Sequence, residues 1–87
     1  MNQAILFTDD QVWNEEQQQV EFSAQFMGAL ILCVVPLAVL EKLSGKKVID
    51  AESALEQFIQ YRFDIEELAE SLIEDEEFNA DGQVMLS

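Results

Sequence analysis

Histidine is absent from these 87 residues, and cysteine, proline and glycine are scarce. Without histidine the commonest general base and metal ligand is missing, so no Ser/His/Asp or Cys/His catalytic arrangement can be drawn. The glycines, Gly28, Gly45 and Gly82, stand far apart, which excludes a glycine-rich loop that cradles phosphate. The single cysteine, Cys33, excludes an intrachain disulfide, and its place in an apolar run predicts a buried, unreactive thiol in a reducing compartment.

Basic residues are also few. Lys42, Lys46, Lys47 and Arg62 stand against 18 acidic residues, and the formal net charge is −14. So acidic a chain is unsuited to nonspecific contact with phosphates, and we expect it to bind neither nucleic acid nor anionic membranes. Most of the charge comes late, because the residues from Asp50 onward include 12 acids and one base. This asymmetry has two interpretations: a solvated surface that keeps the protein soluble, or a surface for a basic protein partner.

A membrane-spanning stretch is lacking as well. Residues 26–40 carry no charge, but a spanning helix needs about 20 apolar residues, and this run contains Gly28 and Pro36. The N-terminus lacks the basic start and early apolar segment of an export signal. Residues 1–87 are therefore predicted to form a single cytoplasmic domain.

Short apolar segments predict the strands of a small sheet. Residues 4–7 form a candidate edge strand, and Trp13 is expected to fold its ring onto the core. Residues 20–27 alternate between apolar and polar side chains, which is typical of a half-buried strand. Gly28 supplies the positive φ of a tight hairpin, and residues 29–35 return as the second strand.

The returning strand, residues 29–35, is apolar on both faces. Such a strand is usually covered on both sides of its sheet, or one side is an interface with another molecule. The chain is too short to cover both sides by itself, which favours a homo-oligomer.

The segment from Asp50 to Glu77 predicts one long amphipathic helix. On a helical wheel its apolar side chains fall within an arc of about 140°, and the opposite face is acidic. Asp50 is the expected N-cap. Because the phase of the apolar arc never slips, a continuous helix is favoured over two helices that meet at residues 61–64. In that second arrangement, Asp64 and Glu67 would form a capping box.

Two shorter elements complete the predicted fold. Pro36 is expected in the first turn of a short helix over residues 36–44, which Gly45 ends, and residues 83–86 predict a closing strand at the sheet edge. The order of elements is then β-β-β-α-α-β. It predicts an α+β fold in which one short and one long helix pack on one face of a small antiparallel sheet of about four short strands.

Two residues break the pattern of the long helix. Phe63 projects into the acidic face, where either the chain or its C-terminal strand covers it, or it is an exposed anchor for a partner. Arg62 lies at the rim of the apolar arc. Either its stem covers the core while its head meets Glu66, or it clamps an anion.

The carboxylates of the long helix are the remaining candidates for chemistry. Glu70, Glu74 and Glu77 lie about one helical turn apart and could bind a divalent cation, and so could the cluster of residues 74–77, although the spacing matches no EF-hand loop. Paired carboxylates catalyse proton transfer in desolvated pockets, whereas nearly all of these acids fall on the face predicted to be wet. A mimic of nucleic acid would need carboxylates spread over a wider surface.

Residues along the whole chain resemble the YrdB-like family of small proteobacterial proteins, which has no assigned activity. The resemblance includes the opening MNQAI and the closing apolar strand. The other matching positions are Trp13, Val20, Phe22, Gly28, Cys33, Phe58, Arg62, Asp64, Glu66, Glu67, Ala69 and Ile73. Pro36 stands where a serine-like helix cap is usual in that family, which changes the cap alone. The resemblance implies a small cytoplasmic α+β protein.

We therefore expect a non-enzymatic protein that binds a protein partner or a second copy of itself, and that needs no cofactor. The candidate binding residues are Phe63, Arg62, Glu66, Glu67, Glu70 and Glu74. The alternative is a small carboxylate-based enzyme or a module that binds a divalent metal ion.

Overall fold

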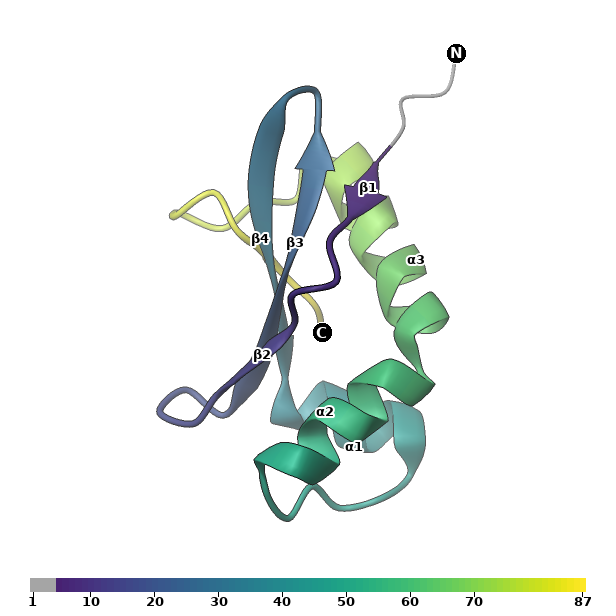
Figure 1. The fold of residues 1–87 in the computed structure, drawn as a ribbon. Helices are drawn as coiled ribbons and strands as arrows, with labels where there is room; N and C mark the ends of the chain where they lie inside the picture. The colour runs from purple at the N-terminus through teal and green to yellow at the C-terminus, as the bar shows by residue number, and fades with distance from the viewer. Residues whose placement is uncertain (1–4) are drawn as a thin grey trace.

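A long hairpin forms the centre of the structure, a computed structural model that describes residues 5–87 (Figure 1). Strand β3, Gln19–Phe26, pairs antiparallel with β4, Ala29–Pro36, along the whole length of both. The connection is the two-residue turn Met27-Gly28, in which both residues have positive φ. That backbone geometry matches the twist of the flanking strands, so the predicted hairpin is confirmed.

The alternation of β3 decides which face of the sheet meets the core. Val20, Phe22 and Ala24 are buried, whereas Gln25 is exposed. On β4, Cys33 and Val35 join the same core. The period-two pattern therefore predicts the buried side chains of β3 correctly.

The sheet differs from the prediction in its edges. Strand β1, Leu6–Phe7, and the unpredicted strand β2, Val12–Asn14, both pair antiparallel with β3. Strand β5, Val84–Met85, forms the predicted closing strand, but it pairs parallel with β4. Residues 5–87 thus form a mixed sheet of five strands, where an antiparallel sheet of about four was expected. Residues 1–4, which include the predicted start of the first strand, lie outside the described part of the chain.

The helices gather on one side of the sheet (Figure 1). Helix α1, Leu37–Ser44, follows β4 directly, and Gly45 caps it in the left-handed conformation as expected. Pro36 is the N-cap and the last residue of β4, one position before the helical turn in which it was predicted. This placement suits proline because its fixed φ is compatible with an extended residue.

The predicted long helix is two helices, and the continuous interpretation is wrong. Helix α2, Ala51–Gln60, begins at the predicted Asp50 cap, whose side chain accepts a hydrogen bond from the Ser53 amide. Helix α3 runs from Arg62 to Glu74, and the two meet at an angle at Tyr61 (Figure 1). Tyr61 has φ −108° and ψ 24°, outside the helical region. The start of α3 has no side-chain cap, so the Asp64–Glu67 capping box does not form.

Packing on the core explains the break. Phe58 near the end of α2 and Ile65 in the first part of α3 are both fully buried. One non-helical residue between them lets both helices keep their apolar sides on the twisted sheet. A straight helix of the same length would lose contact with the sheet at one of its ends. Among the described residues, no helix is both long and apolar enough to cross a membrane.

Candidate functional site

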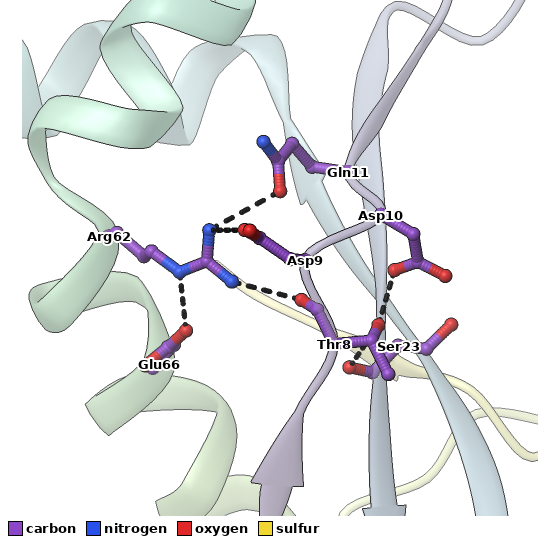
Figure 2. A network of polar contacts seen from close by, with 7 residues as sticks. All are labelled: Thr8, Asp9, Asp10, Gln11, Ser23, Arg62 and Glu66. Carbon is purple, nitrogen blue, oxygen red and sulfur yellow. Dashed lines mark hydrogen bonds and ion pairs between the residues drawn. The ribbon is translucent and has the colours of Figure 1, made fainter.

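Arg62 ties the start of α3 to the loop that follows β1 (Figure 2). Its Nε donates a hydrogen bond to the Glu66 carboxylate at 2.8 Å, and one terminal nitrogen reaches the Asp9 carboxylate at 2.6 Å. The other terminal nitrogen donates to the backbone carbonyl of Thr8 at 2.9 Å. The loop is also fixed from the sheet side, because the Thr8 amide donates to the Ser23 carbonyl at 2.9 Å.

Arg62 therefore fits the first of its two predicted roles. Its guanidinium lies 5.9 Å from the centre of the Phe58 ring, at the edge of the core, and its head meets Glu66 as expected. Hydrogen bonding to Glu66 raises the pKa of Arg62 above its ordinary value, so the charge is permanent. With two carboxylates and a carbonyl on it, the guanidinium has little capacity to bind an external anion. Asp9 is 53 positions from Arg62 in the chain, so helical spacing could not predict this contact.

An open groove of about 430 Å³ lies between β1 and α3, beside this network. Its lining residues are Ile5, Phe7, Phe63, Asp64, Glu66, Glu67 and Glu70. Ile5 and Phe7 are half-buried and pack against the core, so they form an apolar floor. The acids come from one side of α3 and form the opposite wall.

Phe63 stands at this groove with 86% of its surface exposed. The interpretation that the chain or its C-terminal strand covers Phe63 is wrong, because β5 pairs with β4 on the other side of the hairpin from β1. A phenylalanine this exposed contributes little to stability, because its ring is nearly as accessible to water in the folded state as in the unfolded chain. Its position beside four carboxylates makes it a candidate contact residue.

The groove brings together four of the six predicted site residues: Phe63, Glu66, Glu67 and Glu70. Arg62 lies behind the groove and holds its wall, and Glu74 lies further along α3 outside the lining. Ile5, Phe7 and Asp64 were missed by the sequence interpretation. Asp64 has the helical spacing of a wall residue. Ile5, just before β1, and Phe7, in β1, could not be predicted as site residues, because only the tertiary fold brings them next to α3.

The acids of the groove differ in their charge environment. Glu66 is paired with Arg62, whereas within residues 5–87 no ion pair engages Asp64, Glu67 or Glu70. These three acids are also exposed. The groove therefore presents uncompensated negative charge to solvent.

The carboxylates that were predicted to bind a divalent metal ion do not have the expected helical spacing. Helix α3 ends at Glu74, so Glu77 does not continue the turn-by-turn spacing of Glu70 and Glu74. In the part of the chain that the structure describes, no three carboxylate or thiol groups converge as metal ligands.

Replacing Arg62 with methionine should release the loop of residues 8–11. Methionine keeps the apolar stem but removes the hydrogen bonds to Glu66, Asp9 and Thr8, and we expect the free energy of unfolding to fall by about 1–3 kcal/mol. The Thr8 amide, measured by hydrogen exchange, should lose protection. The control is Asp9→Asn, which alters a carboxylate that is 88% exposed and should cost less than about 1 kcal/mol. Unchanged protection at Thr8 in Arg62→Met would contradict this account.

Comparison with known proteins places the chain in a family. The family described as "Protein of unknown function (DUF1488)" matches residues 5–86. The chain is 37% identical to the uncharacterized protein YrdB of Escherichia coli K12 over 87 residues, and 36% identical to YrdB of Shigella flexneri, in both cases across 99% of each chain.

A solved structure gives the same result for the fold. The crystal structure of a protein of unknown function from the DUF1488 family of Shewanella loihica PV-4 superposes with a TM-score of 0.94 at 43% identity. The superposition covers 99% of this chain and 94% of the other. The predicted YrdB-like resemblance and the α+β fold class are both confirmed, and the chain belongs to the DUF1488 family.

Proposed function

We propose that this protein is a non-enzymatic interaction module of the cytoplasm, and that its β1–α3 groove binds a basic segment of a partner protein. The observation that carries the proposal is the composition of the groove. An exposed aromatic ring, three carboxylates outside any ion pair of the described residues and an apolar floor share one hollow.

Each part of the groove suits one part of a lysine or arginine side chain. The aliphatic stem packs on Ile5 and Phe7, and the cationic head reaches Asp64, Glu67 or Glu70. The face of the Phe63 ring attracts the same cation, a contact worth about 0.5–1 kcal/mol at an exposed site. The surrounding excess of negative charge accelerates the approach of a basic partner.

The Arg62 network supports this function by keeping the groove in shape. It joins α3 to the loop behind β1, so the two sides of the groove are held at a fixed separation before any partner arrives. A site that is already ordered loses less conformational entropy on binding.

Catalysis by the same carboxylates is a weaker candidate. Carboxylate pairs act as acid and base when a dry pocket separates their pKa values. Asp64, Glu67 and Glu70 are exposed in an open groove, which favours docking of a charged segment over proton transfer.

The proposal is tested with a displayed library of random peptides selected on the wild-type protein. Selected peptides should be enriched in lysine and arginine, and their affinity is measured by fluorescence anisotropy. Asp64→Asn/Glu67→Gln/Glu70→Gln should weaken binding by about 10- to 100-fold, since each exposed ion pair contributes roughly 0.2–1 kcal/mol. Phe63→Ala should weaken it by about two- to fivefold.

The matched control is Glu52→Gln/Glu56→Gln/Asp81→Asn, which removes the same amount of charge at exposed positions outside the groove. Its binding should fall by less than about threefold, because salt screens distant charges. The proposal is wrong if selection yields peptides without basic residues, or if both triple variants weaken binding equally.

A further inference from the structure

The sheet has a second face that the helices leave uncovered (Figure 1). Side chains of paired residues lie on the same face, so the register identifies its members. Leu6 pairs with Gln25, and Gln25 pairs with Leu30. Two rows further, beyond the pair Ser23 and Leu32, the residues Val12, Glu21, Val34 and Met85 lie side by side across four strands. We call this the outer face, with the apolar members Leu6, Val12, Leu30, Leu32, Val34 and Met85.

Much of the apolar surface on the outer face is open to solvent. Leu30 is 70% exposed and Val12 is 53% exposed, and Leu6 and Met85 are exposed as well. Val34 is buried in the middle of the face. The strand β4 that was predicted to be apolar on both sides therefore has one side on the core and the other on this face.

Charge is nearly absent from the outer face, although the protein carries −14 overall. Among the strand residues that the register places there, Glu21 is the charged one. Its carboxylate accepts hydrogen bonds from the Asn14 and Gln19 side-chain amides, each at 2.8 Å. The acids of α2 and α3 lie on the helical side of the sheet, away from this apolar surface.

From this geometry we infer that the outer face is a homodimer interface, where a second copy packs sheet against sheet. Two twisted sheets that pack face to face lie about 10 Å apart with their strands roughly 30° from aligned. In a dimer with a two-fold axis, the outer face of one copy contacts the same face of the other copy. A basic partner would be drawn to the acidic helical side, whereas the outer face offers it a single carboxylate, Glu21, which is already hydrogen-bonded to Asn14 and Gln19.

Dimensions and electrostatics both permit a second copy. Strands β3 and β4 are eight residues long and the flanking strands add two or three residues each, so the face is on the order of 350 Å² per protomer, and the dimer buries roughly 700 Å², the size of a weak, concentration-dependent interface. In such a dimer the acidic helices of the two copies lie on opposite sides of the stacked sheets. The two helical layers are about 30 Å apart, which is several Debye lengths at physiological salt. Repulsion between the two negative charges is therefore weak.

The test is sedimentation velocity of the full chain between low-micromolar and millimolar concentrations. We expect a concentration-dependent dimer that persists or strengthens at 1 M salt. Val12→Asp/Leu30→Asp should weaken dimerisation at least about a hundredfold, because each aspartate would be desolvated in the interface. Both replaced side chains are more than half exposed, so circular dichroism should show an unchanged fold.

Two controls separate this interface from other surfaces. Ile49→Asp introduces one such negative charge at a side chain that is 81% exposed in the α1–α2 loop, and Phe63→Ala alters the groove. Both should leave the dimer intact. A strict monomer at every concentration would overturn the inference, and so would a dimer that survives Val12→Asp/Leu30→Asp or dissociates with Phe63→Ala. The groove proposal is independent, since salt weakens it and a monomer retains it.

Discussion

Replacing Phe58 with alanine is expected to lower the free energy of unfolding by about 3–5 kcal/mol. Phe58 is fully buried, and its ring centre lies 5.1 Å from that of Phe22 on the central strand β3. The substitution removes the apolar burial, the aromatic contact and the ring under the Arg62 guanidinium together. The free energy of unfolding of a small domain is about 5–15 kcal/mol, so a large share of the variant molecules should be unfolded near 37 °C. Urea denaturation followed by circular dichroism measures the change.

Phe63→Ala is the matched control for this prediction. The same chemical change five residues away, at a side chain that is 86% exposed, should shift stability by no more than about 0.5 kcal/mol. Equal losses in the two variants would mean that the α2–α3 junction is placed differently on the sheet, with Phe63 also buried.

Alkaline pH should destabilise the protein through Cys33. Burial raises the pKa of the Cys33 thiol from its ordinary value of 9.0 to about 12. Below pH 9 the thiol is neutral in both states and has no effect. Between pH 9 and about 12 the unfolded chain releases a proton that the folded chain retains, so the free energy of unfolding falls by about 1.4 kcal/mol per pH unit. By pH 11 the loss should reach about 2–3 kcal/mol.

Comparison with Cys33→Ala isolates this effect. All other ionisable groups are common to both proteins, so the difference between the two stability curves belongs to the thiol. The curves of the wild type and Cys33→Ala should converge as the pH rises from 9 to 11. Parallel curves over that range would show that the folded protein ionises Cys33 as readily as the unfolded chain does.

Sequence patterns predicted correctly the helix starts, strands and turns that depend on residues close together in the chain. The alternation of residues 20–27 and the turn residue Gly28 identify the central hairpin, and Asp50 begins a helix as its cap chemistry requires. In these segments the residues that determine the structure are neighbours in sequence.

Other features were missed because tertiary contacts decide them. The break at Tyr61 leaves the apolar phase of α2 and α3 almost unchanged, so the wheel cannot distinguish one helix from two. Strand β2 is three residues long and exists by pairing with β3. The parallel partnership of β4 and β5 joins segments about fifty residues apart.

The candidate site was predicted in part for the same reason. Helical spacing placed Phe63, Glu66, Glu67 and Glu70 near one another, and they do line one groove. Spacing also joined Arg62 to Glu66. The apolar floor from Ile5 and Phe7, and the contact from Arg62 to Asp9, come from strand β1 and its loop, which pack beside α3 only in the folded chain.

The late position of β5 in the chain has a consequence for synthesis on the ribosome. Val84 and Leu86 are fully or almost fully buried against the hairpin, yet Val84 is made about fifty residues after its partner Cys33. At about 5–20 residues per second, residue 84 is joined to the chain roughly 3–10 s after residue 33. A hairpin that has left the ribosome before β5 pairs with it presents the apolar edge of β4 to any other extended chain nearby. The polypeptide is therefore most exposed to aggregation after the hairpin has emerged and before β5 has paired with β4.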